Sequence, residues 1–151
     1  MNTDAFTIPS STTFSSNGEY ITATTSTSSE KLVYLNHELT DSDNWLFEIE
    51  VARIGTVQSI AVIWNDNSYY GGQGQHELYV YSYMGVQTRK THTVQVGDKF
   101  IVKRENGVTS VYINDELIES KTISHKSSFK VGFFINRSRT QYYKNIQLKQ
   151  L

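Results

Sequence analysis

A chain of 151 residues is the size of one domain and can bury most of its apolar surface in a single core. Its net charge of -1 excludes broad electrostatic attraction to nucleic acid or anionic lipid, because that attraction needs clustered lysine and arginine. The absence of cysteine excludes disulfides, thiolate nucleophiles and cysteine-ligated zinc.

Neither end of the sequence nor its interior shows a membrane signal. No apolar run approaches the roughly 20 residues that span a bilayer, so we expect no membrane insertion. The N-terminal sequence MNTDAFTIPSS has neither a basic nor an apolar segment, which predicts no signal peptide in this chain.

Apolar and polar residues alternate with a period of two along most of the chain, which predicts an all-β protein. The Ser- and Thr-rich segment 10–29 is interrupted by Phe14, Tyr20 and Ile21, which favours edge strands and loops over a flexible linker. The predicted strands are 20–23, 31–36, 44–54, 58–64, 76–83, 99–105, 108–114, 116–123, 129–136 and 142–151. About ten strands in one domain are typical of two packed sheets or a barrel.

The clearest alternation lies in segment 44–54, where the odd-numbered positions from 45 to 51 are all large and apolar. One face of this strand is therefore predicted to be core, and the opposite face solvated. The same periodicity in later strands extends the prediction to an inter-sheet core. Its predicted members are Trp45, Phe47, Ile49, Val51, Phe100, Val102, Val111, Ile113, Phe129, Val131 and Phe133.

Two adjacent tyrosines, Tyr69 and Tyr70, precede the sequence GGQG. Because glycines allow close backbone approach or motion, we predict a loop here that carries both tyrosines to the rim of a sheet. On the following strand, Leu78 and Val80 share the predicted core face, and tyrosines alternate on the other face.

Exposed tyrosines suit sugar binding, because each offers a flat apolar ring and a polar hydroxyl. Two interpretations stay open: the rings bind a ligand, or they cover the sheet as ordinary cross-strand pairs. The loop after segment 129–136 provides further candidates, two arginines. The predicted ligand-binding residues are Tyr69, Tyr70, Gln73, Tyr79, Tyr81, Tyr83, Arg137 and Arg139.

The sequence KFIVKRENGVTSVYINDELIESK, residues 99–121, predicts two hairpins with turns at Asn106-Gly107 and Asn114-Asp115. This stretch resembles concanavalin A-like lectin/glucanase domains, a group that includes laminin-G-like modules and many carbohydrate-binding modules. Segments 44–54 and 129–151 fit the same pattern. The resemblance covers most of the chain from Asn44 onward and implies an antiparallel two-sheet jelly roll with ligands at the concave face or its rim loops. Together with the chain length, it predicts a single domain over residues 1–151.

Glu48 and Glu50 lie on one face of a predicted strand. Glucanases of this fold carry a run of the type E-x-D-x-E at such a position, but here Ala52 stands where the third carboxylate would be. Retaining hydrolysis needs a flanking carboxylate pair about 5 Å apart, so the broken pattern favours a solvated strand face over catalysis. We therefore expect no enzyme activity.

Hard oxygen ligands gather at Asp41, Asp43 and Asp66, and calcium prefers six to eight such oxygens. These residues are the candidate calcium ligands, and no other cofactor is expected. The alternative is that Asp and Asn are ordinary turn residues there, bonding to their own backbone.

These patterns predict a noncatalytic carbohydrate-binding, lectin-like or receptor-binding module, as part of a larger adhesin, glycanase or viral appendage. Its partner would be a glycan or a cell-surface receptor, and we expect an extracellular, cell-surface or virion location. The alternative is a structural or protein-interaction module, such as a virion decoration or fibre domain. An active glycoside hydrolase is the third interpretation, and the missing carboxylate argues against it.

Overall fold

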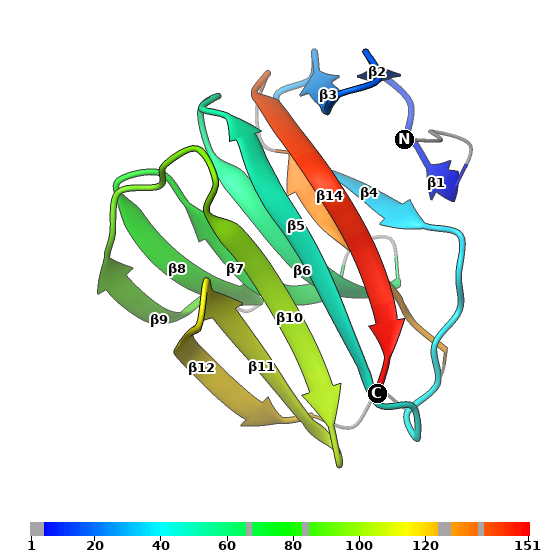
Figure 1. Ribbon diagram of the computed structural model, residues 1–151. Coiled ribbons are helices and arrows are strands. Elements are labelled where there is room, and N and C mark those ends of the chain that lie inside the picture. Colours follow the sequence, from blue (N-terminus) through cyan, green and yellow to red (C-terminus); the bar gives the residue numbers. More distant parts are fainter. Residues whose placement is uncertain (1–4, 66–67, 83–84, 124–127, 136–137) are drawn as a thin grey trace.

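The computed structural model describes residues 5–65, 68–82, 85–123, 128–135 and 138–151. Within these ranges, fourteen strands form two antiparallel sheets of seven strands each, packed face to face (Figure 1). The predicted all-β jelly-roll sandwich is therefore confirmed. The part of the chain described here includes no helix that is long and apolar enough to cross a membrane.

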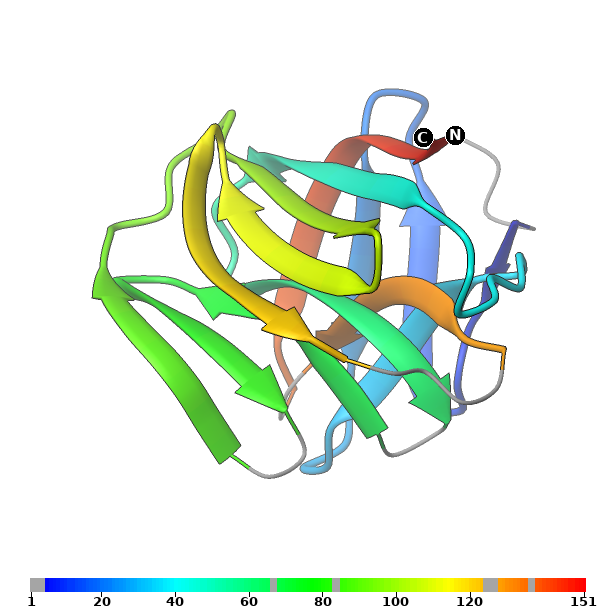
Figure 2. The same cartoon turned by 90° about the horizontal axis from the view of Figure 1, so that it is seen from below.

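We name the two layers sheet A and sheet B, and Figure 2 shows β10, β11 and β12 of sheet B above β6, β7 and β8 of sheet A. Sheet A runs, in spatial order, β1 (Phe6–Thr7), β4 (Lys31–Leu35), β13 (Lys130–Ile135), β6 (Gln58–Asn65), β7 (Ser68–Gly74), β8 (Glu77–Ser82) and β9 (Gly85–Thr91). Sheet B runs β12 (Glu116–Thr122), β11 (Val108–Ile113), β10 (Lys99–Glu105), β5 (Trp45–Arg53), β14 (Thr140–Gln150), β3 (Ile21–Thr25) and β2 (Thr12–Ser16).

The inner faces of the two sheets meet in one apolar core. Alternate residues of β5 and β10 point into it, and the antiparallel register pairs Phe100 with Ile49 and Val102 with Phe47. Every residue predicted for the core from the alternation belongs to it and is at most 4% exposed, which confirms the predicted inward face of these strands.

The turn between β10 and β11 follows its sequence closely. Asn106 and Gly107 have φ angles of 52° and 81°, and the next turn begins at Asn114 with a φ of 54°. Two successive positive φ angles give the hairpin turn whose twist matches the strands on either side, so the predicted Asn-Gly turn is confirmed.

The segment predicted as a loop with two tyrosines is instead β7, a strand inside sheet A. Gly71 pairs with Ala61 of β6 on one side and with Tyr81 of β8 on the other. A Cβ atom at Gly71 would lie 2.0 Å from the carbonyl oxygen of Ile60, so glycine permits a close approach of two strands here. The loop prediction is wrong because these glycines serve packing rather than a turn.

The alternation pattern also misses two other strands of sheet A. The short strand β1 pairs with β4, and β9 pairs with β8 at the opposite edge of the sheet. Most residues of β9 are exposed or half-buried, so the strand shows no apolar face for the pattern to detect.

Replacing Phe133 with alanine should lower the free energy of unfolding by about 3–5 kcal/mol, because the ring is fully buried between the sheets. Urea denaturation followed by tryptophan fluorescence measures this loss. Leu46→Ala, on the half-buried outer face of β5, is the control and should cost clearly less. A loss below about 1 kcal/mol for Phe133→Ala would contradict the assignment of faces.

Candidate functional site

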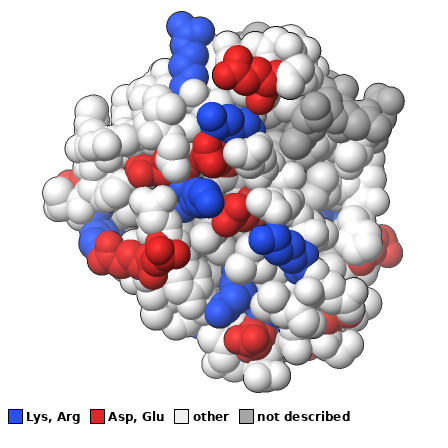
Figure 3. Space-filling model, in the orientation of Figure 1, with Lys and Arg blue, Asp and Glu red and all other residues white. Residues whose placement is uncertain are grey.

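The outer face of sheet B carries interspersed charges of both signs, as Figure 3 shows for this side of the molecule. Glu50 lies 3.4 Å from the Nζ atom of Lys144, and the side-chain amide of Gln147 donates to Glu48 at 3.0 Å. The two glutamates therefore have partners on a solvated face, as the noncatalytic interpretation expects.

The outer face of sheet A has a different construction, with a row of small residues across its centre. Gly132 of β13, Ala61 of β6 and Gly71 of β7 are direct neighbours in the antiparallel register. Tyr34 of β4 continues the row at one end, and Tyr81 of β8 continues it at the other. Two tyrosines therefore flank three positions that have almost no side chain.

Two larger rings occupy the space above this small-residue row. Tyr69 and Phe134 approach with ring centroids 4.8 Å apart, and both belong to an apolar cluster that includes Ala61. Tyr34 and Tyr81, which are half-buried, pack against this cluster from its two sides. We name this group of four rings, Tyr34, Phe134, Tyr69 and Tyr81, the aromatic platform. Phe134 is 1% exposed and belongs to its buried floor, so the exposed ring area comes mainly from Tyr34 and Tyr81.

Tyr69 forms part of the floor of the aromatic platform and is only 8% exposed. Its hydroxyl donates to Oε2 of Glu30 at 3.0 Å. Burial raises the pKa of the Tyr69 phenol, and the charge of Glu30 raises it further, so the phenol stays protonated as the donor. Burial also raises the pKa of the Glu30 carboxyl. This tyrosine is fixed in a strand rather than free to close over a ligand.

Tyr70 points to the opposite side of β7, into the core between the sheets, where it is 1% exposed. Its hydroxyl donates to Glu119 of β12, so the tyrosine ties sheet A to sheet B. The prediction that Tyr70 binds ligand at the rim is therefore wrong. Neighbouring residues of a strand face opposite sides, and only one of the two adjacent tyrosines can face outward.

Tyr79 and Tyr81 both lie on the outer face of β8, as the sequence predicts. Their ring centroids are 5.7 Å apart, which extends the aromatic platform toward the edge of the sheet. The Tyr79 hydroxyl donates to Glu77 at 2.9 Å, and the guanidinium of Arg89 lies over the ring, 5.1 Å from its centroid. One face of Tyr79 is therefore covered by a cation, whereas Tyr81 has no such cover among the described residues.

A hollow of 340 Å³ opens beside Tyr79, at the end of the aromatic platform. Gln73 and Arg139 also line it, together with Glu77. The fold thus brings together three predicted ligand-binding residues, Gln73, Tyr79 and Arg139, from β7, β8 and the segment before β14. The candidates Tyr83 and Arg137 lie outside the described residues.

Sequence reasoning does not identify Tyr34 and Phe134 as part of the site. A signal for Tyr34 exists, because segment 31–36 has apolar residues on both faces, which is typical of strands buried on both sides. Phe134 gives a weaker signal, as the one large apolar residue on a face that also carries Lys130 and Gly132. The small residues Ala61, Gly71 and Gly132 give no such signal, since their alignment across strands depends on register.

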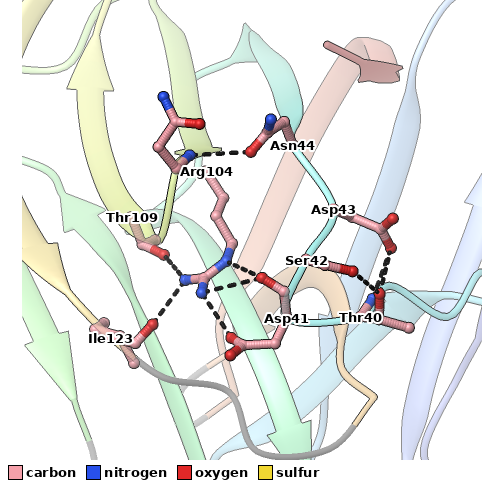
Figure 4. Close-up of polar contacts among 9 residues, drawn as sticks. Thr40, Asp41, Ser42, Asp43, Asn44, Arg104, Thr109 and Ile123 are labelled. Atoms are coloured by element: carbon pink, nitrogen blue, oxygen red, sulfur yellow. Dashed lines mark hydrogen bonds and ion pairs between the residues drawn. The ribbon is translucent and has the colours of Figure 1, made fainter.

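Asp41, one of the predicted calcium ligands, pairs with a buried arginine (Figure 4). Arg104 is 1% exposed, and its Nη2 atom lies 2.6 Å from Oδ1 of Asp41. Its Nη1 atom donates to Thr109 and to the carbonyl oxygen of Ile123. A buried guanidinium needs a counter-charge and full hydrogen bonding, so Asp41 has a structural role here.

The second predicted calcium ligand, Asp43, accepts hydrogen bonds from the backbone and the hydroxyl of Thr40, as a turn residue does (Figure 4). Asp66 lies outside the described residues. Within the described ranges, no group of three His, Asp or Glu side chains is arranged to hold a metal. The calcium site stays an untested prediction.

No family model matches the chain, and no curated sequence matches it. Solved structures are similar in fold. The carbohydrate-binding module CBM66 from Bacillus subtilis matches with a TM-score of 0.69 at 11% identity, covering 96% of this chain and 95% of that one. A functionally unknown protein from Saccharomyces cerevisiae matches with a TM-score of 0.72 at 10% identity, covering 100% and 99%.

A third similar structure is an enzyme, the marine PL7 alginate lyase AlyA1 from Zobellia galactanivorans. It matches with a TM-score of 0.62 at 11% identity, covering 91% of this chain and 80% of that one. At these identities the likenesses show the fold alone, which is the concanavalin A-like jelly roll that the sequence resemblance implies.

Replacing Tyr70 with alanine should destabilise the protein by about 3–5 kcal/mol, because it empties a core position. Tyr70→Phe keeps the ring and loses only the hydrogen bond to Glu119, at a cost of about 1 kcal/mol. Thermal and urea denaturation measure both losses. A stable Tyr70→Ala protein would show that this side chain does not lie in the core.

Proposed function

We propose that this chain is a noncatalytic carbohydrate-binding domain whose glycan packs on the aromatic platform of sheet A. The observation that carries this proposal is the row of three small residues flanked by Tyr34 and Tyr81. It leaves the half-buried rings of Tyr34 and Tyr81 as the contact area beside a buried apolar floor, whereas the outer face of the other sheet is charged.

The aromatic platform has the chemistry that a sugar chain needs. Partly exposed tyrosine rings offer flat apolar surfaces for the C–H faces of sugars, and their hydroxyls bond to sugar hydroxyls. Tyr34 and Tyr81 are separated by four strand spacings of about 4.8 Å, roughly 19 Å in all. That length suits a glycan of several units lying across the strands.

The platform is also rigid, which lowers the entropy lost on binding. Tyr69 and Phe134 form a fixed floor, and the Nζ atom of Lys130 lies 4.9 Å from the ring centroid of Tyr34. The similar structures support the proposal at the level of fold, since one is a carbohydrate-binding module and another is an alginate lyase. An extracellular, cell-surface or virion location stays a prediction.

Removing a platform ring should weaken glycan binding without unfolding the protein. For Tyr81→Ala and Tyr34→Ala we expect a loss of about 1–3 kcal/mol of binding free energy, because stacked area is lost. The ligand is first identified by screening a glycan array, and affinity is then measured by titration calorimetry.

Tyr112→Ala is the matched control for these variants. Tyr112 is a half-buried tyrosine on the outer face of sheet B, with Lys103 over its ring as Lys130 lies over Tyr34. Its removal should leave glycan affinity unchanged. Equal losses for Tyr112 and Tyr81, or normal binding by both platform variants, would place the ligand elsewhere.

The protein should release no reducing sugars from β-glucans, because Ala52 stands where the glucanase pattern has a carboxylate and Glu48 faces the charged side of the sandwich. A colorimetric assay of reducing ends over a long incubation measures this. Release of sugar that disappears in Glu48→Gln would disprove the noncatalytic assignment. Ultraviolet absorbance of unsaturated sugar ends tests for lyase activity in the same samples.

A further inference from the structure

We propose that the hollow at the end of the aromatic platform binds the carboxylate of an acidic sugar unit, and that Arg139 is its anion-binding residue. This inference rests on the proposed carbohydrate-binding function and specifies its ligand as a glycan that contains uronic or similar carboxylated sugars. The hollow has a volume of 340 Å³, enough for one sugar unit at the end of a chain.

Arg139 is half-buried on the wall of the hollow. Its guanidinium has no hydrogen-bond or ion-pair partner among the residues that the structure describes, so its donors are available to a ligand. A carboxylate matches the planar fork of a guanidinium and forms two parallel hydrogen bonds with it. A bound carboxylate would therefore give this arginine the partner that the protein does not provide.

The backbone holds Arg139 in place for such a role. Its carbonyl oxygen accepts a hydrogen bond from the backbone N–H of Thr25, and the preceding Ser138 donates from its backbone N–H to Thr27. The following Thr140 shares a hydrogen bond between hydroxyls with Thr24 of β3. The segment around the arginine is thus fixed to sheet B, while the side chain reaches the hollow at the end of sheet A.

The local charge balance favours an anion. The one carboxylate that lines the hollow, Glu77, accepts a hydrogen bond from Tyr79 and lies 3.5 Å from the Nε atom of Arg89. Arg89 offsets part of this negative charge, whereas Tyr79 is neutral, and Arg139 adds a positive charge to the hollow. Removing the charge of Glu77 should make the field in the hollow more positive, and removing that of Arg139 should make it more negative.

The hollow is continuous with the aromatic platform. Gln73 and Tyr79 are paired neighbours on β7 and β8, and the Tyr79 ring lies next to that of Tyr81. Gln73 adds an amide that can donate to a carboxylate or to a sugar hydroxyl. A glycan that crosses the platform to Tyr81 and then continues along β8 past Tyr79 would place its terminal unit beside Arg139.

The test compares acidic oligosaccharides with neutral counterparts of the same linkage. The probes are oligomers of galacturonate, mannuronate and glucuronate, the same oligomers with their carboxylates reduced to alcohols, and a sulfated oligosaccharide. Titration calorimetry is run on the unaltered chain and on Arg139→Gln, Arg139→Lys and Glu77→Gln. Lys103→Gln, which removes one positive charge from the outer face of sheet B, is the matched control.

We expect at least one acidic oligomer to bind about tenfold more tightly than its reduced counterpart. Arg139→Gln should abolish this preference and lower acidic affinity far more than neutral affinity, and Arg139→Lys should retain only part of the preference. Glu77→Gln should increase affinity for the acidic oligomer, and Lys103→Gln should have no effect. Raising the salt concentration should weaken acidic binding alone.

Three outcomes would overturn this inference while leaving the proposed function intact. They are equal affinity for acidic and reduced oligomers, a loss of neutral binding in Arg139→Gln that equals the loss of acidic binding, and tighter binding of the sulfated oligosaccharide than of any uronate. The proposed binding function fails, and this inference with it, if no glycan binds or if platform and control variants bind alike.

Discussion

The close approach of strands at the centre of sheet A is the constraint on which the site depends. A Cβ atom at Gly71 would lie 2.0 Å from the carbonyl oxygen of Ile60, and one at Gly132 would lie 2.0 Å from that of Val33. Large side chains are therefore excluded from the middle of the outer face. The rings of Tyr69 and Phe134 fill the space, so a steric requirement of the backbone produces the buried aromatic floor of the platform.

The same sheet opens at the end where the hollow lies. The ladder between β6 and β13 gives way to a bridge in which the Ser59 hydroxyl donates to the carbonyl oxygen of Phe134 and accepts from its N–H. Gln141 donates to that carbonyl oxygen as well, and Tyr143 bonds to both Gln141 and the backbone of Ser59. This buried network satisfies the polar groups that the separating strands expose, and it keeps the hollow end rigid.

The outer faces of the two sheets differ in their surface chemistry. Sheet B has paired charges that keep its surface solvated, such as Glu50 with Lys144. Sheet A has an apolar centre with cations near its tyrosines, Lys130 at Tyr34 and Arg89 at Tyr79. The fold itself is compatible with both binding proteins and enzymes, so the surface chemistry of sheet A, rather than the jelly roll, carries the functional argument.

The sequence by itself determined the all-β class, the inward face of the core strands and the Asn106-Gly107 turn, because alternation and turn chemistry are local properties. Only the tertiary structure decided that Tyr70 is core and that Arg139 and Tyr79 line the same hollow. A period of two separates the faces of one strand, but it does not say which strands are neighbours or how close they come. From the sequence alone, the glycines of β7 indicate a loop. The structure shows that the backbone of β6 lies too close to Gly71 for a side chain to fit.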